Sequence, residues 1–464
     1  MLGCFSQPGE ERGVEPSAEP RSAVEINQVE RVAQAIAEDE EKLELMRGMM
    51  GSDDPGTLRC IQNLAVLKQA TGDLSGAFDL LTEALRTRRR VLGSDHPDTL
   101  RSANSLATLQ QAMGDLAGAM TLHENTLAIR RKTLGDLHPD TLTSISNFGM
   151  ALHANKVLDG AQQLYEEALR ARRRSLGDSH PDTLGSINNL GSLRHDMGDL
   201  DVAEELYTEA LSSYRLTLGD SHPRTLCAIN NVASLAADKG DLGGAKVLYD
   251  EALSGCRRTL GDYHPDTLGS ANNLAYVMQD MGELDAAECL YEEVLSSRRR
   301  LLGNAHPDTL SSITNLGSLR KAKDQLSAAE DLYTEALATS RQVFGVQHPS
   351  TAASIYNLAD LLMYKGERER AQLLLKQNLE ALRLRLGDNH VDTHAAGARL
   401  ESLGTASAPS LSQAAQAKRR KNLEARLERV RSGEDRKLKL EEMVTAIRSG
   451  EMPPTVSLDE IRLD

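Results

Sequence analysis

The alternation of apolar and polar positions predicts pairs of amphipathic helices along most of the chain. In residues 184–197, apolar side chains recur every three or four positions, which places them on one face of a helix. Gly198 and Asp199 interrupt this pattern, and residues 200–211 then carry a second apolar stripe before Gly219 ends it. Each pair of stripes therefore predicts a helical hairpin, with helices of about 17 and 18 residues.

The hairpin recurs with a fixed period. A His-Pro-Asp-Thr phrase or a close variant opens each copy, and successive histidines are 42 residues apart. These histidines are His96, His138, His180, His222, His264, His306, His348 and His390. Residues 54–58 form a degenerate first copy, and Val391 replaces the proline of the last one. A period of this length is typical of a solenoid, in which neighbouring hairpins bury each other's apolar stripes.

The repeated histidines are poor candidates for a metal site. Metal ligands must converge on one ion, whereas equivalent residues of stacked hairpins are separated by helices that pack roughly 8–10 Å apart. A structural role is favoured instead, because each histidine except the last precedes a proline, the residue that suits the first position of a helix. We expect each histidine to hold the turn at a helix N-terminus.

The residues of one copy resemble the tetratricopeptide repeat. The motif consists of Asn189-Leu190-Gly191, Gly198-Asp199, Ala203, Tyr207 and Ala210-Leu211. The usual repeat is shorter (about 34 residues), and the Leu-Gly-Asp-x-His-Pro-Asp-Thr-Leu junction is similar to that of the kinesin light chain and nephrocystin-like subfamily. The resemblance implies an all-α, right-handed superhelical solenoid whose inner face binds peptides. Lys156-Val157 and Asp324-Gln325 depart from the motif in two hairpin turns.

The repeats and their flanks divide the chain into four predicted segments. Residues 1–23 are rich in Pro, Gly, Ser and Glu and are expected to be disordered. Residues 24–51 are expected to form one capping helix over the first repeat, and a coiled-coil dimerisation arm is the alternative. Residues 54–400 hold about eight repeats, and residues 401–464 form a linker and a charged helical tail with a basic cluster at 418–421.

Composition and charge exclude several classes of function. Lys and Arg total 53 against 68 Asp and Glu, and the resulting net charge of −15 argues against nucleic-acid binding. The 5 cysteines contain no C-x-x-C pair, so the sequence indicates neither a disulfide framework nor a zinc site. This use of cysteine indicates a reducing compartment. No apolar run approaches the ~18 residues of a membrane helix, and the N-terminus lacks a signal-peptide core. We expect a cytoplasmic protein, which the resemblance would place at the cytoskeleton or a cilium.

No pattern of residues points to catalysis or to a cofactor. The P-loop and the G-x-G-x-x-G nucleotide motif are absent, as are the G-x-S-x-G elbow and the H-E-x-x-H helix. We expect no enzyme activity, no cofactor and no bound metal. Basic clusters end several second helices, at 88–90, 130–132, 172–174 and 298–300. With glutamates a turn or two earlier, these clusters predict a solvated face whose charges compensate each other, and a phosphate track is the alternative.

Asparagine marks the side of the first helix that faces away from the apolar stripe. It recurs at one position of each copy, with Ser105 as the exception, as Asn63, Asn147, Asn189, Asn231, Asn273, Asn315 and Asn357. Further asparagines stand beside it as Asn104, Asn188, Asn230 and Asn272. A carboxamide both donates and accepts, so a ladder of them is able to bind an extended peptide backbone. The alternative is a set of hydrogen bonds between repeats that fixes their stacking.

Variable residues on the same side would supply specificity. Ser192 follows the asparagine by one turn, and Asp196, Asp238 and Asp280 follow one turn later in three successive copies. The three carboxylates predict a ligand segment that carries Lys or Arg at this place.

These features predict a scaffold or adaptor that binds linear segments of other proteins. The resemblance gives a narrower form, a kinesin-light-chain-like cargo adaptor, although the long coiled coil by which such light chains join the motor chain is not found in this sequence. The alternative is a regulatory or tethering subunit that acts through its basic C-terminal tail on an anionic surface or another complex.

Overall fold

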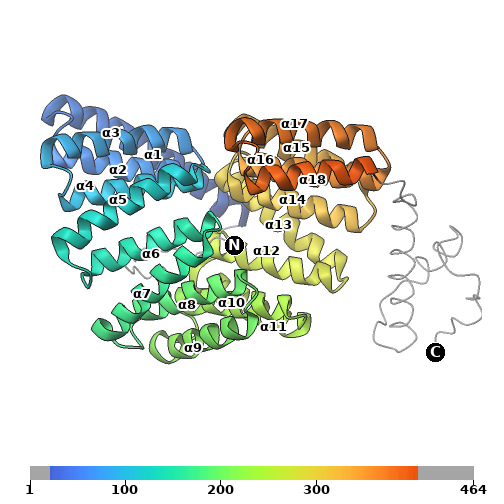
Figure 1. Cartoon of the computed structure of the whole chain (residues 1–464), viewed down its shortest axis with the longest axis horizontal. Coiled ribbons are helices and arrows are strands. Elements are labelled where there is room, and N and C mark those ends of the chain that lie inside the picture. Colours follow the sequence, from blue (N-terminus) through green and yellow to red (C-terminus); the bar gives the residue numbers. More distant parts are fainter. Residues whose placement is uncertain (1–20, 406–464) are drawn as a thin grey trace, which may run out of the picture. The chain divides into compact units, whose positions relative to one another are not determined.

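The computed structural model describes residues 21–405, which form eighteen α-helices and no strand (Figure 1). The helices are α1 (Arg21–Met50), α2 (Pro55–Ala70), α3 (Leu74–Leu92), α4 (Pro97–Ala112), α5 (Leu116–Leu134), α6 (Pro139–Ala154), α7 (Leu158–Leu176), α8 (Pro181–Asp196), α9 (Leu200–Leu218), α10 (Pro223–Asp238), α11 (Leu242–Leu260), α12 (Pro265–Asp280), α13 (Leu284–Leu302), α14 (Pro307–Ala322), α15 (Leu326–Phe344), α16 (Pro349–Lys365), α17 (Arg368–Leu386) and α18 (Val391–Thr405). The prediction of an all-α stack of consecutive hairpins is confirmed. Of the segment predicted to be disordered, 1–23, residues 21–23 belong to α1, and residues 1–20 lie outside the described residues. Of the predicted linker and tail, 401–464, residues 401–405 end α18, and residues 406–464 lie outside the described residues.

The helices divide between two compact units. Of the described residues, the first unit contains 21–324 and 342–344, so it holds α1 to α14 and the last turn of α15. The second contains 325–341 and 345–405, so it holds the remainder of α15 and α16 to α18. Within the first unit each helix packs against the next one in the chain, as consecutive hairpins require. In the second unit α16 packs against α17 and α17 against α18.

Each repeated histidine acts as an N-cap, as the sequence predicts. His180 has an extended backbone, and its Nδ1 accepts a hydrogen bond of 3.1 Å from the backbone N–H of Asp182. The same bond, between 3.0 and 3.2 Å, is made by every histidine of the phrase from His96 to His390. Asp54 takes the place of the histidine before α2. The cap satisfies one of the N–H groups that the first turn of a helix leaves without a partner.

Most hairpin turns place a glycine in the left-handed region of backbone space. Gly198, for example, has φ +83°. Lys156 and Asp324 stand where the turn glycine is missing, and both adopt the same conformation, with φ of 60° and 64°. A residue with a Cβ is strained there, so these two departures from the motif change the residue and keep the turn.

A buried aromatic residue from the second helix fills the space within each central hairpin. Tyr165, Tyr207, Tyr249 and Tyr291 are each less than 5% exposed. They pack under small residues of the first helix, so that a Cβ added to Gly191 would lie 2.8 Å from the Tyr207 ring. The close approach of the two helices explains why the motif requires a glycine or alanine at this position.

Helix α1 packs against the first repeat. Leu43 is 4% exposed and clusters with Leu58 and Ile61 of α2, with Ile36 and Met46 beside it. Helix α1 also contacts α13, which is far from it in sequence and belongs to the same unit. The turn of the first hairpin likewise approaches the start of α14, since a Cβ on Gly72 would lie 3.2 Å from the His306 ring.

Candidate functional site

All the predicted site residues lie on the first helices of the hairpins, between α2 and α16, and none of them is buried. We call the side of these helices that carries the asparagines the amide face. In the first unit it is defined by Asn63, Asn147, Asn189, Asn231, Asn273 and Asn315, and Asn357 stands at the same repeat position on α16 of the second unit. The asparagines remain accessible because the apolar stripe of each helix, such as Leu184, Ile187 and Leu193 of α8, is turned into the core.

Three of the seven asparagines of the ladder are engaged in hydrogen bonds between repeats. In the part of the chain that the structure describes, three pairs form, each between residues 43 apart. Asn147 Nδ2 donates to Asn104 Oδ1 at 2.9 Å, Asn231 to Asn188 at 2.8 Å, and Asn315 to Asn272 at 2.9 Å. Gln62 Nε2 and Ser105 Oγ make a weaker bond of 3.4 Å at the corresponding place between α2 and α4. These bonds join neighbouring first helices.

The other four asparagines of the ladder, Asn357 of the second unit among them, have no such bond in the described residues. Within residues 21–405, the amides of Asn63, Asn189 and Asn273 make no hydrogen bond to another side chain or to the backbone. The neighbouring residue of the preceding repeat explains the difference. Asn147 and its bonded counterparts face an asparagine, whereas Asn189 faces Ser146, whose hydroxyl is bonded to Arg172 and to the Leu142 carbonyl. The side chains of Asn189 and the other members of this set are at least partly exposed.

Asn230 departs from this pattern. Its Nδ2 donates to Ser270 Oγ at 2.8 Å, and its Oδ1 is buried without a hydrogen-bond partner. Because Asn230 Oδ1 accepts no hydrogen bond, Asn273 is not bonded to the preceding repeat in the way that Asn231 and Asn315 are.

The three predicted aspartates are all exposed, but two already have partners. Asp196 Oδ2 lies 3.1 Å from His153 Nε2 and 3.4 Å from Lys156 Nζ. Partial burial opposes ionisation of Asp196, but Lys156 and His153 outweigh it, and its pKa is lowered. Asp238 Oδ2 lies 2.7 Å from His195 Nε2.

Asp280 is the third aspartate, and it has no imidazole beside it. Ala237 occupies the position at which His153 and His195 stand in the earlier repeats. The pKa of the Asp280 carboxyl is raised because partial burial outweighs the hydrogen bond from Tyr276.

Ser192 serves the packing of the hairpin as well as the surface. It is hydrogen-bonded to the hydroxyl of Tyr207, whose pKa is raised by burial. The corresponding Ser234 is bonded to Tyr249. The role in ligand specificity predicted for Ser192 does not include this internal contact, because Tyr207 lies on the other helix of the hairpin and helical periodicity does not show it.

In two of the basic clusters, the second residue forms the expected self-compensating face. Arg131 and Arg173 each reach a glutamate 36 residues later, on the second helix of the next repeat, at 2.6 Å. Arg215 and Arg257 stand at the same position in two other repeats and make the same contact, at 2.6 and 2.7 Å. Such exposed pairs contribute little individually to stability.

The first residue of each cluster is not on that solvated face, and the prediction was wrong for it. Arg88, Arg130 and Arg298 are 6% to 8% exposed. Arg130 Nη1 donates to Ser144 Oγ at 2.7 Å and to the Asp140 carbonyl at 2.9 Å, and so crosses from α5 to α6. Burial lowers the pKa of these guanidinium groups. The local sequence places an arginine at a helix end, but it does not show that the next repeat covers that end.

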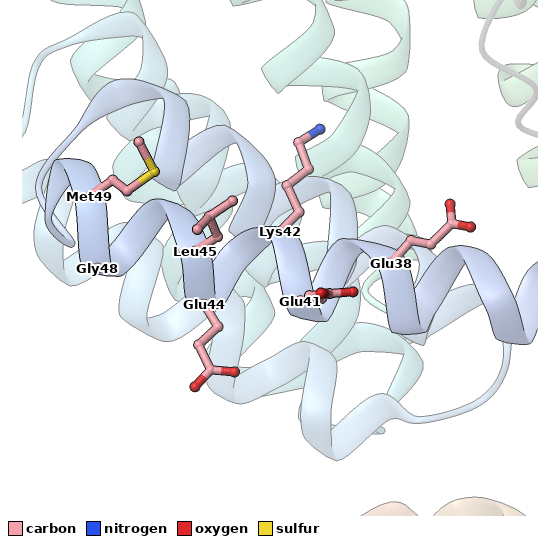
Figure 2. Close-up of a pocket in the computed structure, with 7 residues that line it drawn as sticks. All are labelled: Glu38, Glu41, Lys42, Glu44, Leu45, Gly48 and Met49. Atoms are coloured by element: carbon pink, nitrogen blue, oxygen red, sulfur yellow. The ribbon is translucent and has the colours of Figure 1, made fainter.

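Other sites are few in the described residues. No group of three or more His, Cys, Asp or Glu within residues 21–405 is arranged to hold a metal ion. None of the helices in that range combines the length and apolarity that a membrane crossing requires. A shallow hollow runs along α1, lined by Glu38, Glu41, Lys42, Glu44, Leu45, Gly48 and Met49 (Figure 2). Its lining contains no nucleophile paired with a base.

A family model for the tetratricopeptide repeat matches seven overlapping segments that run from residue 58 to residue 384. The segments are 58–132, 104–172, 140–216, 186–255, 224–300, 270–342 and 308–384. No curated protein matches the chain.

Several solved structures are similar to parts of the chain. The nearly identical TPR-like repeats of a protein described as a kinesin light chain from Podosopora anserina are 29% identical, with a TM-score of 0.37, and the match covers 44% of this chain and 97% of that one. A second crystal structure, of a variant form of the same repeats, gives the same values. BtubC (BKLC) from P. vanneervenii is 21% identical, with a TM-score of 0.39, and the match covers 53% of this chain and 92% of that one.

Proposed function

The chain belongs to the tetratricopeptide repeat family, and from this premise we propose that it is a scaffold whose amide face binds an extended segment of a partner protein. Proteins of this family generally act in protein–protein interaction. The observation that carries the proposal here is the set of amides that no other described residue engages. These are Asn63, Asn189 and Asn273, which stand at the same repeat position on the first helices α2, α8 and α12.

The physical argument concerns the cost of placing asparagine on a helix. Asparagine is a poorer helix former than alanine by several tenths of a kcal/mol. For Asn147, Asn231 and Asn315, the hydrogen bond to the preceding repeat offsets that cost. Asn189 and Asn273 make no such bond. An extended backbone lying across them would supply both a donor and an acceptor for each carboxamide.

The asparagines with and without a hydrogen bond between repeats provide a matched experiment. Peptides are selected on the immobilised full-length chain from a random library, and one is labelled for fluorescence anisotropy. The first variant combines Asn63→Ala, Asn189→Ala and Asn273→Ala, and it is expected to lose at least about tenfold in affinity, or about 1.4 kcal/mol. Its unfolding midpoint should not fall, because alanine is the better helix former.

The matched control combines Asn147→Ala, Asn231→Ala and Asn315→Ala. It removes three hydrogen bonds between repeats, so stability should fall by about 3 kcal/mol at roughly 1 kcal/mol a bond. Peptide affinity, measured where this variant is folded, should change less than in the first variant. Equal affinity of the first variant and the wild type would refute the proposal, as would the failure of selection to yield any peptide.

A kinesin-light-chain-like cargo adaptor is the narrower form of the proposal, and its support is the Leu-Gly-Asp-x-His-Pro-Asp-Thr-Leu junction of the repeats. The alternative function, tethering through the basic tail, concerns residues outside those that the structure describes. Deletion of residues 410–440 separates the two. Peptide binding that survives the deletion supports the amide face, and binding that disappears with the tail supports tethering.

A further inference from the structure

The repeat formed by α12 and α13 interrupts the amide face in two ways. The first concerns Tyr276, which stands where Ser192 and Ser234 stand in the two preceding repeats. Those serines are hydrogen-bonded to the buried tyrosine of the second helix, Tyr207 and Tyr249. With Tyr276 in this place, the equivalent Tyr291 loses that bond: its side chain is 1% exposed, and its hydroxyl has no hydrogen-bond partner.

The second interruption concerns Asp280. Asp196 and Asp238 accept hydrogen bonds from His153 and His195 of the preceding repeat, but Ala237 stands before Asp280. Within residues 21–405, no lysine, arginine or histidine pairs with the Asp280 carboxylate. It accepts a hydrogen bond from the hydroxyl of Tyr276, one turn earlier on α12.

These two differences between repeats leave the Tyr291 hydroxyl without a hydrogen bond and the Asp280 carboxylate without a cationic partner among the described residues. An unsatisfied buried hydroxyl costs about 1–3 kcal/mol of stability. The pKa of Tyr291 is raised, mainly by burial and further by Tyr276 and Asp280, so these two residues lie near its hydroxyl. The ring of Tyr276 is 52% exposed and presents an aromatic surface beside a carboxylate. Residues that weaken the fold and expose an aromatic ring are expected where a ligand binds.

We propose that Tyr276 and Asp280 form a subsite for an arginine side chain in the extended segment that the amide face binds. The inference rests on the proposed function and makes it more specific. A guanidinium group stacks on an aromatic ring and forms two parallel hydrogen bonds with a carboxylate. Lysine is a point charge without the planar fork, so it fits this pair less well. Asp196 and Asp238 lack this combination, because each is hydrogen-bonded to a histidine and has a serine, not a tyrosine, one turn before it.

The test uses a peptide selected on the full-length chain and three versions of it. The versions carry arginine, lysine or citrulline at the arginine position, and citrulline keeps the shape of arginine without its charge. Dissociation constants are measured by fluorescence anisotropy for the wild type, Asp280→Asn and the control Asp238→Asn. Citrulline should weaken binding to the wild type by about tenfold or more, the loss expected when a charge-assisted bond is removed. It should weaken binding to Asp280→Asn by less than about twofold, because the partner is already gone.

Two further variants sharpen the result. Asp238→Asn should retain the full citrulline penalty. Tyr276→Ser restores the serine found in the two preceding repeats, so it should lose the arginine preference while its unfolding midpoint does not fall.

Three results would overturn the subsite. Selected peptides with no enrichment in arginine, or an equal citrulline penalty in the wild type and in Asp280→Asn, would remove it and leave the scaffold function intact. A lysine version that binds as tightly as arginine would remove the guanidinium assignment. Failure to select any peptide would remove the subsite together with the proposed function.

Discussion

At the scale of single residues, the most informative positions are those at which one copy of the repeat carries a different residue from the others. His123 occupies the position that holds tyrosine in five later copies. It is 2% exposed, its Nδ1 is buried without a hydrogen-bond partner, and burial lowers its pKa to about 4. A buried imidazole in this environment remains neutral in the folded protein at pH values where it is protonated in the unfolded chain.

The His123→Tyr substitution should therefore reduce the sensitivity of the fold to acid. The folded pKa of His123, about 4, lies below the ordinary value of 6.5, so the unfolded chain binds more protons between these two values. Stability contributed by the neutral imidazole is fully present above pH 6.5 and is lost as the pH falls towards 4, by up to about 3 kcal/mol. Urea unfolding of wild type and variant at pH 7.5, 6.0 and 4.5 measures the difference.

In that comparison the variant should gain on the wild type as the pH falls. The acid sensitivity of every other histidine is common to both proteins and cancels in the difference. Parallel stability curves over the whole pH range would show that His123 does not carry this effect.

At the scale of helices, most of the first helices begin with a histidine where the first copy uses an aspartate. Both residues have an acceptor that reaches the N–H groups of the first turn, as His222 does at 3.1 Å and Asp54 at 2.8 Å. They differ in their response to pH, because an imidazole accepts a hydrogen bond at Nδ1 only while it is neutral. Burial and Arg224 lower the pKa of His222, so the cap is kept in that form.

Replacing His222 should separate the cap from the imidazole. His222→Ala is expected to lose about 1 kcal/mol at pH 7.5, the usual contribution of an N-cap. His222→Asp should retain the cap, as Asp54 does before α2. The folded pKa of His222 lies below its unfolded value, so wild-type stability falls as the pH drops below 6.5, and His222→Asp should fall less there. Thermal unfolding at pH 7.5 and 5.5 tests both statements, and an unchanged midpoint in His222→Ala would contradict the first.

At the scale of the first unit, the array makes a contact that the order of its helices does not require. Consecutive hairpins contact their neighbours, yet α1 also contacts α13, and Gly72 lies against His306 at the start of α14. A simple stack has only nearest-neighbour terms in its stability. The contact therefore adds a term that joins the first repeat to a distant one within this unit.

Two glycines in equivalent turns allow this term to be measured. Gly72 and Gly198 have φ of +84° and +83°, so alanine strains the backbone similarly at each. A Cβ on Gly198 meets no atom within 4 Å, whereas one on Gly72 meets His306 at 3.2 Å. Gly72→Ala should therefore destabilise the protein more than Gly198→Ala, whose cost is about 1 kcal/mol from strain alone. Urea unfolding of the two variants gives the comparison, and equal losses would show that the contact is absent in solution.

The periodic sequence determined the helices and their ends. The signals are apolar residues three and four apart, a histidine and proline at most helix starts and a glycine at most turns. Each of them acts over one or two turns of the chain, so the sequence of a single copy is sufficient to predict its helices. Lys156 and Asp324 show that the turn persists even where its usual glycine is absent. The side of the first helix that carries the asparagines also followed from helical periodicity alone.

Tertiary structure decided what those side chains do, because their partners lie a full repeat away. Asn147 binds Asn104 while Asn189 binds nothing in the described residues, and the difference depends on a neighbour 43 positions earlier. Arg130 is buried by the start of the next helix, although its own sequence places it at an exposed end. The contact of α1 with α13 depends on small rotations that accumulate from repeat to repeat, and a pattern within a single repeat does not contain their sum.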